Sequence, residues 1–209
     1  MVAHRTLTPF VRVRILHPLP NKNADFDTIS VLILLHPGFS DFLFERVDIP
    51  MVELIRYHLE KKEEWDDFYG LFRSYLSEVC DEEEYKEEID DLHNDELNAR
   101  MINQTLQDHD PYFIMRIVEN QVCVGLISYS YHEEHSRGFI NNFYVCSEHR
   151  NSGIGSAALK MVENHLRSFG AKYIELAPVA KAERFYIRNR FELSRKSSVG
   201  ERVLGKVLR

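Results

Sequence analysis

The sequence has few cysteines and no long hydrophobic run, and both absences exclude classes of protein. Its three cysteines, Cys80, Cys123 and Cys146, have no paired spacing, which argues against a disulfide framework or a structural zinc site. No window of about 18 uncharged apolar residues occurs, so no transmembrane helix is expected. The opening segment, MVAHRTLTPF, lacks the hydrophobic core of a signal peptide. We therefore expect a cytoplasmic protein with no membrane partner.

A histidine-rich segment at residues 132–135, HEEH, does not have the spacing of a zinc protease. Its histidines are three positions apart at a predicted hairpin tip, whereas the zinc motif needs them four apart on a helix. We therefore expect no metal ion.

Charge is distributed unevenly, although the net charge is only −7. Residues 81–96 hold ten acids and one lysine, whereas residues 167–209 hold eleven bases and four acids. Two interpretations stay open: the segments serve a cationic ligand and a polyphosphate respectively, or both are solvated helix faces. The bases are not interleaved with aromatic residues, so no nucleic-acid partner is expected.

The clearest pattern is an apolar run, a polar loop with two glycines and a helix, over residues 139–169. Residues 140–145 predict a strand that leads into the loop. After the loop, apolar residues recur at helical spacing and Gly170 stands where a C-cap is expected; they are Ile154, Ala158, Met161, Val162, Leu166 and Phe169. The backbone N–H groups of residues 150–155 would meet at the helix start, which predicts a phosphate-binding turn.

The same glycines fit a dinucleotide-binding fingerprint, with Glu175 about twenty residues further on. Two observations disfavour that alternative. Seven residues separate Val145 from Gly153, whereas a dinucleotide fold turns almost directly from strand to glycine. Only 56 residues follow Gly153, too few for the strands and helices that such a fold adds.

Arg150, Gly153 and Gly155 match the pattern Q/R-x-x-G-x-G/A, and the chain thereby resembles the GNAT superfamily of N-acetyltransferases. Residues 143–145, FYV, resemble the family's L-x-V strand end, and residues 182–186, AERFY, resemble its later A-x-x-F/L-Y motif. The resemblance covers roughly residues 44–209. It implies an enzyme that transfers an acetyl group from acetyl-CoA, its co-substrate, to an amine.

The resemblance also implies which residues hold the cofactor. The pantetheine arm is expected along Phe143, Tyr144 and Val145. The pyrophosphate is expected on Arg150, Asn151, Ser152, Gly153, Ile154, Gly155 and Ser156, assisted by the helix dipole.

Tyr186 matches the family tyrosine that protonates the departing sulfur or donates a hydrogen bond to it. Its phenol, with an ordinary pKa of about 10, is protonated at neutral pH. Many relatives have a glutamate on the central strand that takes the amine proton, but Asn141 occupies that position here and cannot accept one. The base is therefore unassigned, with candidates on the predicted hairpin: His132, Glu133, Glu134 and His135.

The predicted fold class is α/β, more narrowly the α+β GNAT fold, in which helices flank a mixed, mostly antiparallel central sheet. Residues 1–43 are predicted to form a strand-rich extension, with strands at 10–16 and 28–35, and residues 44–209 to form the acetyltransferase domain. That domain would begin with a strand at 42–49 and a helix at 51–59. Further helices are predicted near 65–79, 97–106 and 181–190, and further strands at 112–119, 122–131, 173–176, 191–196 and 202–208.

Two functions of different class follow. The first is acetyl transfer to a primary amine of a small or polycationic molecule, by direct attack in a ternary complex. The second is an acyl-CoA-binding module without catalysis, which the absent strand carboxylate favours and the retained Tyr186 disfavours. The sequence leaves a homodimer open.

Overall fold

The computed structural model describes residues 28–30, 52–107, 109–197, 200 and 202–209. Its centre is an eight-stranded sheet in the order β1-β2-β3-β4-β5-β6-β8-β7. Neighbouring strands are antiparallel except β5 and β6, which run parallel. The strands are β1 (Thr28–Ser30), β2 (Val52–Arg56), β3 (Tyr112–Glu119), β4 (Val122–His132), β5 (Arg137–Val145), β6 (Tyr173–Leu176), β7 (Glu192–Lys196) and β8 (Arg202–Val207).

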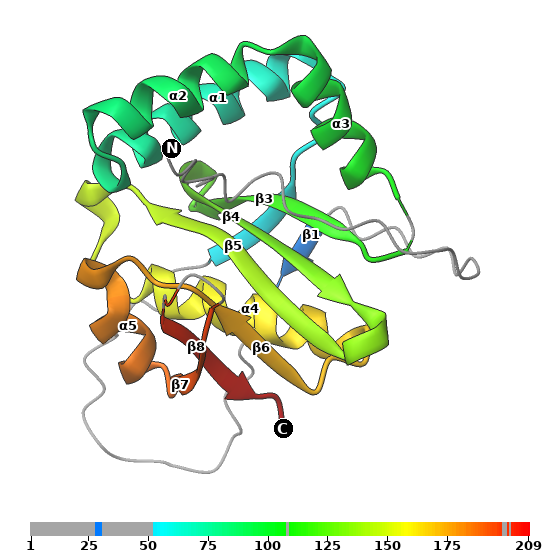
Figure 1. Ribbon diagram of the computed structural model, residues 1–209, viewed down its shortest axis with the longest axis vertical. Coiled ribbons are helices and arrows are strands. Elements are labelled where there is room, and N and C mark those ends of the chain that lie inside the picture. The colour runs from blue at the N-terminus through cyan, green and yellow to red at the C-terminus, as the bar shows by residue number, and fades with distance from the viewer. Residues whose placement is uncertain (1–27, 31–51, 108, 198–199, 201) are drawn as a thin grey trace, which may run out of the picture.

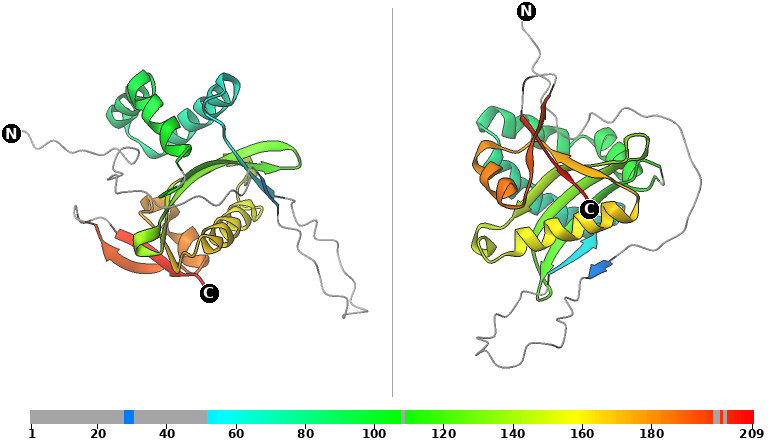
Figure 2. Two further views of the ribbon diagram at one scale, coloured as in Figure 1. Left: turned by 90° about the vertical axis from the view of Figure 1, so that its right-hand side faces the viewer. Right: turned by 90° about the horizontal axis from the view of Figure 1, so that it is seen from below.

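Helices cover both faces of the sheet (Figures 1 and 2). One face carries α1 (Lys62–Val79), α2 (Glu82–Leu92) and α3 (Asp95–Thr105), and the other carries α4 (Ile154–Ser168). The short helix α5 (Glu183–Arg188) lies between β6 and β7 in the chain. This arrangement confirms the predicted α+β class with a mixed, mostly antiparallel sheet.

Local sequence explains why these helices form where they do. In α1 the buried residues Phe68, Phe72 and Leu76 recur every fourth position and so form one apolar face. Asp81 caps α2 by accepting hydrogen bonds from two backbone N–H groups, and Glu84 accepts a bond in return from the Asp81 N–H, which is a capping box. Asn94 caps α3 in the same way, without the return bond.

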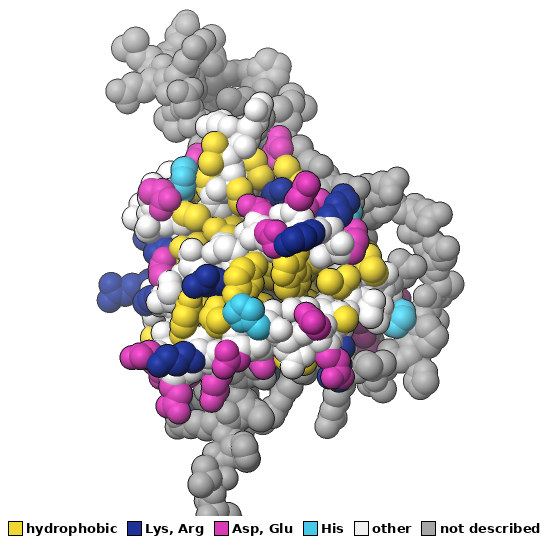
Figure 3. Space-filling view, turned by 90° about the horizontal axis from the view of Figure 1, so that it is seen from above, with side chains coloured by type: hydrophobic (Ala, Val, Ile, Leu, Met, Phe, Trp, Pro, Cys, Tyr) yellow, Lys and Arg dark blue, Asp and Glu magenta, His cyan; other side chains and the backbone are white. Residues whose placement is uncertain are grey.

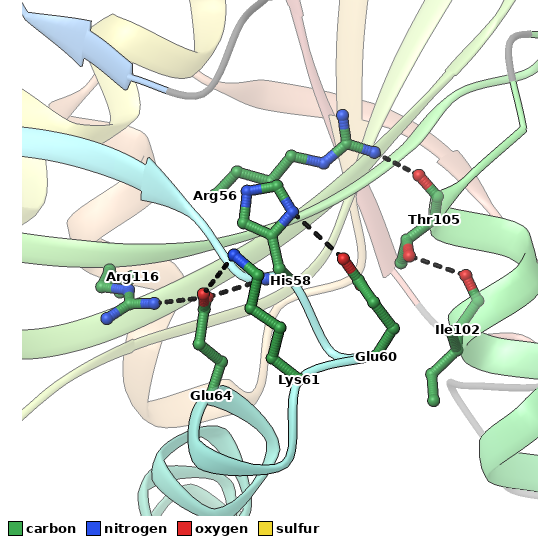
Figure 4. Close-up of polar contacts among 8 residues, drawn as sticks. All are labelled: Arg56, His58, Glu60, Lys61, Glu64, Ile102, Thr105 and Arg116. Atoms are coloured by element: carbon green, nitrogen blue, oxygen red, sulfur yellow. Dashed lines mark hydrogen bonds and ion pairs between the residues drawn. The ribbon is translucent and has the colours of Figure 1, made fainter.

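The helical layer is attached to the sheet by a partly buried polar network (Figure 4). The Nη2 atom of Arg116 on β3 lies 2.6 Å from Oε2 of Glu64 on α1, and the same oxygen accepts from the backbone N–H of His58. The guanidinium of Arg116 also lies 4.5 Å from the ring centroid of Tyr57. Arg56 donates to the carbonyl of Thr105 at the end of α3. These contacts fix where α1 and α3 lie relative to the sheet.

The two central parallel strands separate partway along their length. β5 pairs with β6 only through residues 137–140 and 173–176, after which β6 ends. The second half of β5, residues 142–145, pairs with β4 alone. The register of that pairing shifts at Asn141, which is the extra residue of a β-bulge. The edge of β5 that faces away from β4 is therefore open beyond Ile140.

One expectation about the first part of the chain needs correction. The helix predicted at 51–59 is wrong, because Val52 and Leu54 alternate toward the core and the segment pairs with β3 as strand β2. Of the predicted strand-rich extension, the described residues include only the three-residue β1, which pairs with β2, so the extension stays a prediction. The strands predicted at 10–16 and 42–49, and the boundary between residues 43 and 44, lie outside the described residues.

The other predicted elements are confirmed, with adjusted ends. The strand predicted at 140–145 begins three residues earlier, at Arg137. The helix predicted at 181–190 is a 3₁₀ turn, Ala180–Ala182, followed by the six residues of α5.

Candidate functional site

The loop before α4 places free backbone donors at a helix start. Gly153 is the N-cap of α4 with φ of 93°, a left-handed conformation that favours glycine, and no side chain caps the helix. The N–H groups of Ile154, Gly155 and Ser156 belong to the first turn, where an α-helix offers no internal acceptor. Together with the helix dipole they form a suitable site for an anion.

Gly155, the second glycine of the loop, allows close packing between two helices. A Cβ atom added there would lie 3.3 Å from the ring of Phe185. Because α5 carries Phe185, the absence of a side chain at residue 155 lets α5 approach the start of α4.

A cavity of about 800 Å³ extends from this loop along the open edge of β5. Of the residues predicted for the site, nine line the cavity: Phe143, Tyr144, Val145, Arg150, Asn151, Gly153, Gly155, Ser156 and Tyr186. Ser152 and Ile154 are not among its lining residues. The Ser152 hydroxyl donates to the carbonyl of His149, and Ile154 is buried in the core.

The side chains of β5 near the cavity point to opposite faces of the sheet. Phe143 packs toward α5, with its ring 5.7 Å from that of Phe185 and 6.5 Å from that of Tyr186. Tyr144 points toward α1, where its ring lies 5.9 Å from that of Tyr75. Side chains of both α1 and α5 therefore line the cavity.

Arg150 contacts other protein groups through its side chain and through its backbone N–H. Its Nη2 lies 2.8 and 2.9 Å from the two carboxylate oxygens of Glu78, and its Nε donates to the Val145 carbonyl at 2.7 Å. Its own N–H donates to the carbonyl of Ser147. The role of Arg150 at the pyrophosphate stays a prediction, and its N–H already has an acceptor within the protein.

Glu78, at the end of α1, joins three parts of the cavity wall. Besides Arg150 it accepts a hydrogen bond from the Tyr144 hydroxyl at 3.0 Å, and its backbone carbonyl accepts one from Lys181. The hydrogen bonds from Arg150 hold the pKa of Glu78 below its ordinary value. Burial, reinforced by Glu78, raises the pKa of Tyr144 to about 12. At neutral pH the Glu78 carboxylate is therefore ionised and the Tyr144 phenol is protonated.

Tyr186 is held inside the cavity wall by α5. Its side chain is 7% exposed and its ring lies 5.8 Å from that of Phe191. Burial, followed by the nearby phenol of Tyr75, raises the pKa of Tyr186. The phenol is therefore protonated at neutral pH and available as a proton donor.

No carboxylate occupies the central-strand position in the cavity. Asn141 lines it from the β-bulge, and its Nδ2 is buried with no hydrogen-bond partner among the described residues. None of the hairpin candidates for the base lines the cavity: His132 ends β4, and Glu133, Glu134 and His135 form a 3₁₀ turn at the opposite end of β5.

Tyr75, Glu78 and Lys181 also line the cavity, and sequence reasoning missed them. Tyr75 belongs to an aromatic stripe that is typical of a core-facing helix. A signal for Glu78 was available, because it is a charged residue between Tyr75 and Val79 near the end of an otherwise apolar face.

The described residues fit a coenzyme with an anionic end and an extended arm. The uncapped start of α4 suits a diphosphate, the open edge of β5 offers backbone groups for an amide-containing arm, and the Asn141 amide lacks an acceptor. In the described part of the chain no group of three or more His, Cys, Asp or Glu residues is arranged to hold a metal ion. No described helix is both long and apolar enough to cross a membrane.

A cavity where parallel strands separate beside an uncapped helix start suits a coenzyme-dependent transferase. The model of the acetyltransferase (GNAT) family matches residues 65–190. The chain belongs to this family: it is a GNAT-type N-acetyltransferase and uses acetyl-CoA. No curated protein sequence matches the chain.

Solved structures share the fold at low sequence identity. PaiA N-acetyltransferase from Thermoplasma acidophilum, in complex with coenzyme A, is 15% identical with a TM-score of 0.59, over 75% of this chain and 98% of that one. An acetyltransferase from Thermus thermophilus is 16% identical with a TM-score of 0.57, over 75% and 97%. The microcin C7 self-immunity acetyltransferase MccE, in complex with acetyl-CoA and AMP, is 13% identical with a TM-score of 0.55, over 75% and 92%.

Proposed function

We propose that the protein transfers the acetyl group of acetyl-CoA to a primary amine of a small or polycationic molecule, by direct attack in a ternary complex. One observation carries the proposal. The uncapped start of α4, the open edge of β5 and the buried phenol of Tyr186 all border one cavity. Bound acetyl-CoA supplies an activated thioester there.

In this proposal the chain's own groups have separate tasks. The N–H groups of Ile154, Gly155 and Ser156 bind the pyrophosphate, and the β5 backbone around Phe143 orients the arm. The Tyr186 phenol donates its proton to the sulfur as the thiolate leaves. Such an acid typically contributes about 10²- to 10⁴-fold to the rate.

The acidic segment supports an amine as acceptor. It forms α2 and its flanks, and α2 packs against α1, which supplies Tyr75 and Glu78 to the cavity wall. Carboxylates of this segment attract a cationic acceptor to this side of the molecule.

Binding and turnover test the proposal separately. Calorimetry with acetyl-CoA is expected to show binding, and release of free thiol is expected with at least one amine of a panel that includes polyamines and amino sugars. Gly153→Ala is expected to weaken acetyl-CoA binding tenfold or more, because alanine strains the left-handed N-cap. Gly170→Ala is the matched control, since Gly170 has φ of 95° at the other end of α4 and a Cβ there would make only an ordinary 3.5 Å contact.

A second candidate is an acyl-CoA-binding module without catalysis, which the amide at Asn141 favours. Acetyl-CoA binding without thiol release across the whole panel would favour the module. Absence of binding, or equal binding by both glycine variants, would contradict the placement of the pyrophosphate on α4.

A further inference from the structure

A second cavity, of about 910 Å³, is bordered by α4, the end of α5 and the strands β7 and β8 (Figure 1). Its lining includes six bases and two acids, which gives it a net charge of +4. The bases are Lys160, Arg167, Arg188, Arg190, Lys206 and Arg209, and the acids are Glu163 and Glu192. Five of the eleven bases of residues 167–209 thus gather in one cavity. The positive charge of this part of the chain is therefore concentrated at one place.

The two lysines of the cavity already have an acidic partner. Glu163 on α4 is 2% exposed, and its carboxylate oxygens lie 2.6 Å from Nζ of Lys206 on β8 and 3.6 Å from Nζ of Lys160. These ion pairs join α4 to β8 and so hold two walls of the cavity together. The positive charge that is left for a ligand therefore comes from the arginines.

Four arginines border the cavity without an acidic partner among the described residues. Arg167 donates only to the neutral Oδ1 of Asn164, at 3.3 Å. The guanidinium groups of the other three have no hydrogen bond or ion pair to a described residue; they belong to Arg188, Arg190 and Arg209. A guanidinium offers paired N–H donors that match two oxygens of a phosphate. Several such groups around one cavity are therefore typical of a site for phosphate groups.

Arg190 occupies a backbone position that favours glycine. It follows Asn189, the C-cap of α5, and has φ of 68°. Its N–H donates to the carbonyl of Ile187 and the N–H of Phe191 donates to that of Tyr186, which completes a Schellman motif. Of the six described non-glycine residues with positive φ, Arg190 is the only basic one. An arginine lowers stability here relative to glycine, and strained residues of this kind cluster at ligand sites.

The cavity also has an apolar side. Leu193 on β7 and Val207 on β8 are 54% and 66% exposed, and both line it together with Tyr173. Such a surface suits the ring of a nucleoside. On the face of α1 to α3, which Figure 3 shows, charges of both signs instead surround the hydrophobic side chains. The second cavity therefore combines apolar groups with an excess of positive charge.

We propose that this cavity binds a polyphosphate group, either of a nucleoside triphosphate or of inorganic triphosphate, at a site distinct from that of acetyl-CoA. Arg190 and Arg209 bind phosphate oxygens there, and Leu193 contacts the nucleoside where one is present. The volume suits a small molecule, and the bases are not interleaved with aromatic residues as in a nucleic-acid surface. Arg188 lines both cavities, so the two sites meet at the end of α5. The proposal does not depend on the identity of the acceptor amine.

Calorimetry on the chain saturated with coenzyme A tests the proposal, because the coenzyme then occupies the first cavity. The probes are ATP and inorganic triphosphate in a magnesium-free buffer without phosphate. We expect binding of one probe molecule per chain, with an affinity that falls as salt is added. Tighter binding of ATP would make the nucleoside part of the ligand, whereas equal affinities would assign the polyphosphate alone. Absence of binding by both probes, or displacement of coenzyme A by either, would overturn the site.

Arg190→Gly separates binding from folding. Glycine relieves the left-handed backbone, so the melting temperature is expected not to fall. The affinity for triphosphate is expected to fall about tenfold or more, because a charge-assisted contact is lost, while the affinity for coenzyme A stays unchanged. Arg209→Gln is expected to weaken triphosphate binding in the same way.

Lys196→Gln is the matched control, because Lys196 is an exposed base of β7 that does not line the cavity. It should change the affinity for triphosphate less than about twofold in 0.15 M salt, since screening weakens charges that do not touch the ligand. Equal losses in Lys196→Gln and Arg190→Gly would show a general attraction of anions to a basic surface and would overturn the site. Wild-type affinity in a folded Arg190→Gly variant would also overturn it.

Discussion

Replacing Glu88, a largely buried acid whose side chain has no hydrogen bond or ion pair to a described residue, with glutamine should stabilise the protein at alkaline pH. Its pKa rises from an ordinary 4.5 in the unfolded chain to about 7 in the folded one. That gap corresponds to roughly 3 kcal/mol when both states are fully ionised. Because water still reaches part of the side chain, we expect about 2 kcal/mol to be realised.

The sign of the effect follows from which state holds the proton. Below about pH 4.5 the carboxyl is protonated in both the folded and the unfolded chain, so it does not lower the free energy of unfolding there. Between 4.5 and about 7 the unfolded chain ionises first, and the folded protein loses stability as the pH rises. Above about pH 7 the folded protein carries the full loss of stability. Glu88→Gln removes this loss, so its free energy of unfolding should exceed that of the wild type by about 2 kcal/mol at pH 8 and by under about 1 kcal/mol at pH 5.

Urea unfolding is the appropriate assay, because it gives the free energy of unfolding at each pH. For a chain of this length the advantage at pH 8 also corresponds to a rise in Tm of about 4 to 8 °C. Glu83→Gln, which changes an exposed acid of the same helix, is the matched control and should change the free energy of unfolding by less than about 0.5 kcal/mol at either pH. A Glu88→Gln variant that is less stable than wild type at pH 8, or equally stabilised at both pH values, would show that the carboxylate has a partner.

Two other predictions concern the site and its support. Tyr186→Phe should lower turnover tenfold or more in the thiol-release assay while calorimetry finds acetyl-CoA affinity little changed, because only the departing sulfur needs the hydroxyl; unaltered turnover would exclude the role. Gly125→Ala should destabilise the protein by about 3 kcal/mol or more, because its Cβ would lie 2.2 Å from the Tyr144 carbonyl oxygen. Gly70→Ala, where nothing lies within 4 Å in helix α1, should instead stabilise it by up to about 1 kcal/mol in urea unfolding; similar losses in both variants would refute the packing argument.

The central part of the fold was predictable because its periodicity is long and regular. Ile154 to Phe169 kept one apolar face over four turns, and the structure places that face in the core as α4. The segment around Val52 and Leu54 failed for the opposite reason. Five residues provide too few repeats to separate a period of 2 from one of 3.6, and pairing with β3 decides the outcome.

Candidate residues on one continuous unit were also predictable, whereas contacts between units were not. Gly153 and Gly155 both lie where the loop after β5 becomes α4, so the local sequence was enough to place them. The partner of Arg150 could not be deduced, since Glu78 lies 72 positions away and meets it only because α1 ends above the loop. Sequence spacing gives no information about that encounter.

The acidic segment shows how a charge count hides the informative residue. Its ten acids suggested either a cation-binding face or a solvated helix, and the count could not separate these interpretations. Position within the helix does separate them. Glu88 lies three residues after Tyr85 and four before Leu92, on the side of α2 that packs inward, so it is a charge on an apolar stripe. Because burial of a carboxylate without a partner opposes folding, Glu88 lowers the stability of the folded chain, and the pH dependence of the Glu88→Gln variant measures by how much.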